Sequence, residues 1–191
     1  MAAVALTPFE SALAARMPVF AGLPHRRMEA WKWTDVRAAL RDDLAPAIEE
    51  VIAPSVFANA GPYEILVMNG RAEWTGPAPE GVSVSKGDRG PAAGHPLADL
   101  AAALSHESLV ITIDGAVAQP TLIRRVAGAG AVHARAHVRL APGAQATIIE
   151  SFDGAGAFFS NSAIRYDIGA GAHLTRIIRQ NAGEAGVETA F

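Results

Sequence analysis

Residues 133–140 read HARAHVRL, and one period further along the chain residues 161–168 read NSAIRYDI. In the first stretch, apolar side chains alternate with basic and imidazole side chains, which is the period of a half-buried strand. Each stretch is followed by a glycine-containing turn and a second strand-like run. Aligning the two turns gives a repeat of about 28 residues. The inward positions then superpose as Ala136 on Ile164, Val138 on Tyr166 and Leu140 on Ile168.

A repeat of this length that keeps its strand phase is typical of a solenoid. Strand–turn–strand units without a helix cannot bury an apolar face alone, and stacking them as coils of a β-helix supplies the missing cover. The alternative is a β-sandwich in which two hairpins are similar by coincidence. We therefore expect a mainly β protein with an N-terminal α-helical region, in which residues 116–191 form the first coils of a β-helix.

The residues before these coils divide into a helical region, 1–55, and a mixed strand and loop connection, 56–115. Thr7-Pro8-Phe9-Glu10 fits a capping box and predicts a helix that Pro18 ends. Further elements are expected as follows: a short helix capped by Thr34 or Asp35 and running through Leu40, helical turns at 47–52, a strand at 64–68 before the Asn69-Gly70 turn, a short strand at 82–84, a helix at 96–104 and a buried strand at 109–113.

Composition excludes several classes of protein. The chain has 191 residues, 16 basic and 19 acidic side chains, a formal charge of −3 and no cysteine. This balance lacks the electrostatic footprint of nucleic-acid binding, and without Cys the chain has no disulfide, thiolate nucleophile or thiolate metal site. No apolar run approaches the ~20 residues of a membrane helix, and the first residues lack the basic start of a signal peptide. The sequence predicts a cytoplasmic protein.

Three local patterns resemble catalytic or nucleotide-binding motifs. His106-Glu107 begins like a zincin motif, but Val110 occupies the position of the second histidine. Ser83 and Lys86 have the spacing of a Ser/Lys pair, yet they lie in an alternating run and not on one helical turn. Pairs of glycines that lack the third glycine of a dinucleotide fingerprint are better interpreted as turns. They are Gly128 with Gly130, Gly154 with Gly156 and Gly169 with Gly171.

His133 and His137 project from the same face of the predicted strand, with Arg135 between them. Two neutral imidazoles could bind a metal ion, but Arg135 opposes a cation and that strand face carries no carboxylate. The sequence therefore favours a solvated or partner-facing outer face. His173 is expected to lie beside Gln145 on the adjacent coil. The spacing of the acidic residues supports no acid–base pair. These residues are Asp114, Glu150, Asp153, Asp167 and Glu184.

Trp31 and Trp33 form the remaining candidate site. They could stack on a ligand, but such residues more often anchor a terminal segment to the next domain, and the sequence favours an anchor. No interleaving of aromatic and basic residues predicts a nucleic-acid surface. No catalytic, cofactor-binding or metal-binding residue is therefore assigned in this chain.

Several segments resemble the SufD proteins, a family of the SUF iron–sulfur cluster assembly system with SufB as its paralogue. Arg27-x-Glu29-x-Trp31-Lys32-Trp33-Thr34 resembles the R-x-E-x-W-K-Y-T segment near the family's N-terminus. Residues 65–71, ILVMNGR, resemble its LVFVNGRF strand, and residues 81–84 resemble the segment after it. Residues 133–152 and 161–180 look like the opening coils of its β-helix.

The resemblance implies a right-handed parallel β-helix and a scaffold subunit that contacts SufB and the ATPase SufC. It implies no enzyme activity of this chain, and it places an iron–sulfur cluster and reduced flavin only at the level of the full complex. Trp33 replaces the family's usual Tyr. The later coils and the C-terminal helical region of the family are absent from this chain, so no functional residue is carried over.

Residue 191 falls mid-pattern, and we expect the exposed end of the stack to be covered by a second copy or by a rearranged C-terminal segment. Two other functions remain open. A carbohydrate-processing β-helix enzyme needs paired carboxylates in one groove, which the acidic residues do not suggest. A filament-forming structural β-helix predicts salt-dependent polymers and no contact with SufB or SufC.

Overall fold

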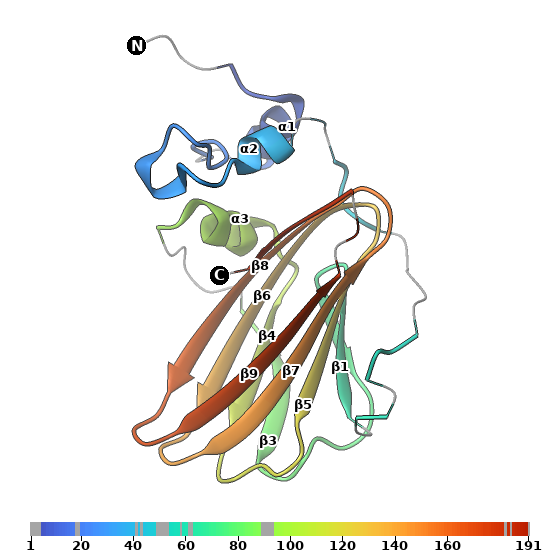
Figure 1. Ribbon diagram of the computed structural model, residues 1–191, viewed down its shortest axis with the longest axis vertical. Helices are drawn as coiled ribbons and strands as arrows, with labels where there is room; N and C mark the ends of the chain where they lie inside the picture. Colours follow the sequence, from blue (N-terminus) through green and yellow to red (C-terminus); the bar gives the residue numbers. More distant parts are fainter. Residues whose placement is uncertain are drawn as a thin grey trace.

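Two five-stranded mixed sheets and a group of short helices make up the described part of the chain (Figure 1). The structure is a computed structural model that describes residues 5–17, 20–40, 42, 44–48, 54–57, 59–60, 63–88, 94–181, 183 and 185–190. The helices are α1 (Pro8–Arg16), the 3-10 turn η1 (Glu29–Trp31), α2 (Val36–Ala39) and α3 (Pro96–Leu104). The strands are β1 (Glu64–Met68), β2 (Arg71–Trp74), β3 (Val82–Gly87), β4 (Ser108–Ile113), β5 (Thr121–Ala127), β6 (Gly130–Leu140), β7 (Gln145–Gly154), β8 (Phe158–Ile168), β9 (His173–Asn181) and β10 (Gly186–Ala190). Within these ranges no helix is long and apolar enough to cross a membrane.

From β4 onward, each successive strand lies in the opposite sheet. One sheet has the order β2-β1-β5-β7-β9 and the other has the order β10-β8-β6-β4-β3. Neighbouring strands from β4 to β10 pair in parallel, whereas β2 and β3 pair antiparallel with their neighbours, which makes both sheets mixed. The expected mainly β class is confirmed, and the two sheets do not close on each other.

The strand register agrees with the period in the sequence. Between β6 and β8, Val138 pairs with Tyr166 and the other aligned residues also pair, each 28 positions apart. The β7–β9 pairs have the same spacing, and the β4–β6 and β5–β7 pairs are 27 positions apart. The alternative of two similar hairpins is wrong, because β6 and the next strand, β7, lie in different sheets.

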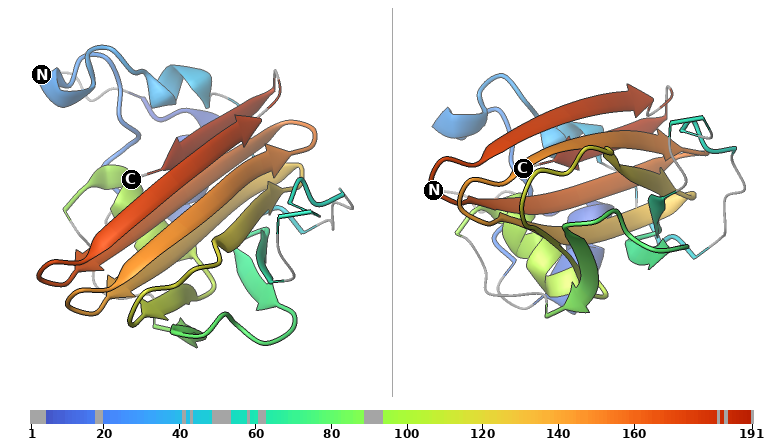
Figure 2. Two further views of the ribbon diagram at one scale, coloured as in Figure 1. Left: turned by 60° about the horizontal axis from the view of Figure 1, so that its bottom comes forward. Right: turned by 90° about the horizontal axis from the view of Figure 1, so that it is seen from below.

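The main apolar core lies between the two sheets (Figure 2). Ile65 and Ile123 from one sheet and Ile111 and Val138 from the other are almost completely buried there. The alternation of the sequence explains this, since residues two apart on a strand project from the same face. Strands from the 56–115 range and from the 116–191 range share both sheets and this core.

A layer of helices covers the outer face of the sheet that contains β6 and β8. Figure 2 shows α3 against this face, on the side opposite the other sheet. Leu97 and Leu100 of α3 pack with Phe9 and Leu13 of α1 and with Phe159 of β8 in a second apolar cluster. The helix predicted at 96–104 is confirmed with the same bounds.

The predicted capping box at the start of α1 is present. The Glu10 backbone N–H donates to Thr7 Oγ1 at 3.2 Å, and the Thr7 N–H donates to Glu10 Oε2 at 2.9 Å. Glu10 is buried and also accepts from the Leu23 N–H and the Arg37 Nε. α1 ends at Arg16, and Pro18 lies outside the described residues. Asp35 caps α2 by accepting from the Ala38 N–H.

The remaining local predictions have mixed outcomes. The strand at 64–68 and its turn are confirmed, and Asn69 and Gly70 both have positive φ, as a tight hairpin turn requires. Helical turns at 47–52 are wrong at Ala47, which instead donates its N–H to the Ala131 carbonyl in an extended segment. Residues 49–52 lie outside the described residues.

Candidate functional site

The inward-facing columns of side chains become polar toward the last strands. In one sheet, Val132, Ser160 and Glu188 are register partners across β6, β8 and β10. In the other sheet, Ile148 of β7 pairs with Arg176 of β9. Positions that are apolar in earlier strands of a sheet therefore carry charges in later ones. We call the group formed there the inter-sheet cluster, and its members are Arg125, Glu150, Tyr166, Arg176 and Glu188.

Glu150 is the centre of the inter-sheet cluster and its side chain is 1% exposed. Arg125 Nε donates to Glu150 Oε2 at 3.2 Å, and Arg176 Nε donates to Glu150 Oε1 at 2.7 Å. The Tyr166 hydroxyl donates to the same Oε1 at 3.3 Å. Since Arg125, Glu150 and Arg176 come from β5, β7 and β9, one carboxylate connects three adjacent strands of the sheet.

The two arginines keep Glu150 ionised although it is buried. Burial by itself raises the pKa of Glu150, but attraction to Arg125 and the hydrogen bond and charge of Arg176 outweigh it and hold the pKa below its usual value. Burial, followed by the nearby Glu150 charge, raises the pKa of the Tyr166 phenol, which stays neutral. Glu150, Tyr166 and Arg176 therefore do not supply a proton donor or acceptor near neutral pH.

Glu188 is the member of the cluster that can exchange a proton near neutral pH. Burial raises its pKa to about 7, and the Asp153 and Glu150 charges act in the same direction. Gln180 and Arg125 act in the opposite direction. One carboxyl oxygen of Glu188, Oε1, is buried without a hydrogen-bond partner.

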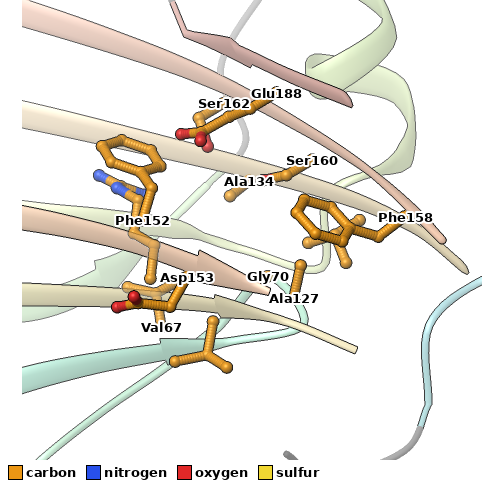
Figure 3. A pocket seen from close by; sticks show the side chains of 13 residues that line it. Val67, Gly70, Ala127, Ala134, Phe152, Asp153, Phe158, Ser160, Ser162 and Glu188 are labelled. Atoms are coloured by element: carbon orange, nitrogen blue, oxygen red, sulfur yellow. The ribbon is translucent and has the colours of Figure 1, made fainter. Parts of the chain in front are cut away.

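A small cavity lies beside Glu188 between the sheets. Figure 3 shows the side chains of Asp153, Ser162 and Glu188 around it, with Phe152 and Phe158 among the apolar groups. Its volume is about 10 Å³, which is room for about one water molecule. Ligand pockets are about 300 Å³ or larger, so this cavity does not fit a flavin or an organic substrate.

His133 is placed differently from the expected solvated outer face. Its side chain is 5% exposed, because the helical layer covers β6 at this point. The ring contacts Phe159 edge to face, and Asn161 Nδ2 lies 3.4 Å from Nδ1. Burial, with a smaller effect of the Arg16 charge, lowers the pKa of His133 to about 3, so the imidazole is neutral. That part of the prediction is wrong, because a covering layer cannot be seen from one strand.

His137 lies nearer the surface and has a carboxylate partner. Its Nε2 is 2.6 Å from Asp167 Oδ2, and Arg165 Nε donates to Oδ1 of the same carboxylate. The histidine strand itself has no carboxylate, but β8 brings Asp167 beside it from 30 positions away. Among the described residues, no group of three or more His, Cys, Asp or Glu side chains could hold a metal ion.

Two other expectations can be compared with the structure. His173 and Gln145 are register partners on β9 and β7, as predicted. Ser83 and Lys86 both lie on β3, where residues three apart project from opposite faces, and Lys86 Nζ binds Glu107 at 3.0 Å. The Ser/Lys pair is therefore not formed, in agreement with its interpretation as a chance spacing.

Trp31 and Trp33 have different environments. Trp31 packs against the apolar cluster of α1 and α3, and its ring lies 5.5 Å from that of His95. Trp33 is 90% exposed and belongs to no apolar cluster of the described residues. The anchor prediction is thus confirmed for Trp31 and wrong for Trp33.

The comparisons with known proteins return no match: no family model matches the chain, and no curated protein matches it either. The functional interpretation therefore depends on the geometry above. The inter-sheet cluster was missed in the sequence because its members are spread from residue 125 to residue 188. The repeat offered a signal, since it places Glu150 in the same column as Ile123.

Proposed function

We propose that this chain is the N-terminal part of a SufD-type scaffold subunit of the SUF iron–sulfur cluster assembly system. In this proposal the two sheets are the opening coils of a right-handed parallel β-helix in a cytoplasmic protein. The subunit acts through contacts with SufB and the ATPase SufC and has no active site of its own. The cluster is cargo of the assembled complex, and reduced flavin also belongs at that level.

The strand register is the observation that carries this proposal. Parallel pairs 27 or 28 positions apart recur in both sheets, as successive coils of a β-helix require. The order of elements along the chain also fits, because short N-terminal helices precede a hairpin at Asn69-Gly70 and then the repeating strands. This is the order that the resemblance to SufD implies.

The last strands offer surfaces for protein contacts. β9 is the terminal strand of its sheet, so one of its edges has no neighbour among the described strands. Ile177 and Ile178 of β9 are 50% and 43% exposed, and Ile168 at the end of β8 is 47% exposed. Unpaired strand edges with apolar side chains favour association with another chain, which supports a scaffold. A second copy of the chain is a further partner for this edge.

Co-purification tests the proposal. The tagged full-length gene product is expressed together with the SufB and SufC homologues of the same organism, and an unrelated ABC-type ATPase serves as the control. We expect SufB and SufC to co-elute with the tagged chain and the control ATPase not to. Elution without SufB and SufC contradicts the scaffold role, and salt-dependent polymers under the same conditions favour the filament alternative.

A further inference from the structure

The segment from Arg27 to Thr34 contains one tryptophan that packs on the apolar core and one that is exposed to solvent. Trp31 packs into the apolar cluster of the helical layer. Trp33, two residues later, is 90% exposed. An indole is the largest apolar side chain, and exposing it to water forgoes most of the free energy that its burial provides. The core therefore gives no reason for a tryptophan at position 33.

Local contacts shape the loop that presents Trp33. The 3-10 turn Glu29–Trp31 precedes it, and the Thr34 N–H donates to the Trp31 carbonyl at 2.9 Å. Lys32 Nζ binds Glu29 at 3.1 Å and lies 5.7 Å from the centre of the Trp33 ring. Trp31 is only partly buried, but its packing on the apolar cluster and the Thr34 hydrogen bond hold the backbone that carries the indole, which reduces the entropy lost when a partner binds it.

A basic groove begins on the same loop. It has a volume of about 450 Å³, and its lining includes His25, Arg26, Arg27 and Arg37, with Asp35 as the acidic group among the lining residues. Arg37 is already bound to the buried Glu10 at 2.8 Å. Arg26 is 78% exposed, and its Nε lies 3.8 Å from Asp35 Oδ2. This ion pair is long and near the surface, so it contributes little to stability. The groove thus presents the guanidinium groups of Arg26 and Arg27 to solvent.

We propose that Trp33, Arg26 and Arg27 form a docking site for an acidic segment of a partner protein that also carries an aromatic or aliphatic side chain. Tryptophan and arginine are the residue types that most often dominate binding energy in protein interfaces. Arginine binds carboxylates through paired hydrogen bonds, and the exposed indole packs on an apolar side chain.

The charges nearby favour a short acidic peptide over a nucleic acid. Glu29 and Asp35 lie within the same loop and would repel a continuous polyanion. The chain as a whole has a formal charge of −3, without the basic excess of nucleic-acid-binding domains. This inference does not depend on the scaffold proposal, because it concerns the helical region and not the stacked strands.

Titration calorimetry on the full chain tests the site. The probe is a synthetic peptide in which Asp and Glu residues flank one Phe, and its counterpart with Lys in place of the acids is the control peptide. We expect the acidic peptide to bind, the Lys peptide not to bind, and added salt to weaken the binding. Trp33→Ala and the double variant Arg26→Ala with Arg27→Ala should each weaken binding by about tenfold or more.

Two variants outside the site serve as matched controls. Ile48→Ala removes another exposed apolar side chain, 86% exposed, and Arg71→Ala removes another exposed arginine. Both should bind the acidic peptide as the unmodified chain does. Peptide affinity weaker than about 1 mM, or equal affinity in Trp33→Ala, overturns the proposal. Tighter binding of a single-stranded oligothymidylate than of the peptide also overturns it and identifies a nucleic-acid site instead.

Discussion

At the scale of single residues, we expect the buried carboxylate of Glu150 to contribute more to the stability of the fold than any other member of the inter-sheet cluster. It neutralises Arg125, which is 5% exposed, and Arg176. Glu150→Ala leaves both guanidinium groups without their partner, and removing one partner of a buried ion pair costs about 3–5 kcal/mol. We expect this loss in the free energy of unfolding, measured by urea denaturation. Glu73→Ala, at an exposed carboxylate, should change it by less than about 0.5 kcal/mol. Equal effects of the two substitutions would contradict the role given to Glu150.

Glu188 predicts a pH dependence of stability with a defined sign. Its pKa is raised from 4.5 to about 7 in the folded chain. The folded state therefore favours the protonated form, so the contribution of Glu188 is fully present below pH 4.5 and is lost as pH rises to about 7. Glu188→Gln keeps a neutral side chain at every pH. We expect it to be increasingly more stable than the unmodified chain across this window, as measured by unfolding at successive pH values. A constant difference would refute the prediction.

At the scale of elements, the hairpin of β1 and β2 packs closely against β6. Gly70 has a φ of +81°, and a Cβ there would lie 2.5 Å from the His133 carbonyl oxygen. Gly143 has a similar φ of +75° but open space around it. We expect Gly143→Ala to cost about 1 kcal/mol, from the left-handed backbone alone. Gly70→Ala should cost about 3 kcal/mol because the clash adds to it. Thermal or urea unfolding of both variants separates the two effects, and equal losses would rule out the close approach.

The helical layer is held to the sheet by Phe159. This side chain is completely buried, with ring centroids 5.8 Å from Phe9 of α1 and 5.7 Å from His133 of β6. Phe159→Ala leaves a cavity between the layers and should lower the free energy of unfolding by about 3–5 kcal/mol. Near-ultraviolet circular dichroism and urea denaturation measure the change. A loss below about 1 kcal/mol would show that the helices are attached by other contacts.

At the scale of the whole molecule, the terminal strand β9 predicts self-association. Ile177 lies on the outer face of β9 and is 50% exposed. A charge on an edge strand opposes pairing with another chain. We expect Ile177→Lys to shift the molecular mass in light scattering toward the monomer, with little change in unfolding. Ile48→Lys, at another exposed isoleucine, should leave the mass unchanged. A chain that is monomeric at all concentrations before any substitution contradicts this expectation.

Strand phase and repeat length could be predicted from the sequence because both depend on side chains close together along the chain. The alternation in residues 133–140 and its repetition at 161–168 were enough to identify the pairs between β6 and β8. The burial of His133 could not be predicted, because it depends on which outer face the helices cover. The partner of His137 was missed because Asp167 comes from the neighbouring strand β8, 30 positions along the chain. The inter-sheet cluster combines side chains from both sheets, and the sequence did not show how the two sheets face each other.

The ion pairs of Glu150 affect how the strands β5, β7 and β9 unfold. In an array of stacked repeats that contact only their neighbours, the terminal unit can fray without disturbing the rest. Here, detachment of β9 removes Arg176 and leaves the buried Glu150 without one of its two arginine partners. Because Glu150 lies on β7, the loss of this ion pair also destabilises the pairing of β7 with β5. We therefore expect β5, β7 and β9 to unfold as one cooperative unit and not strand by strand.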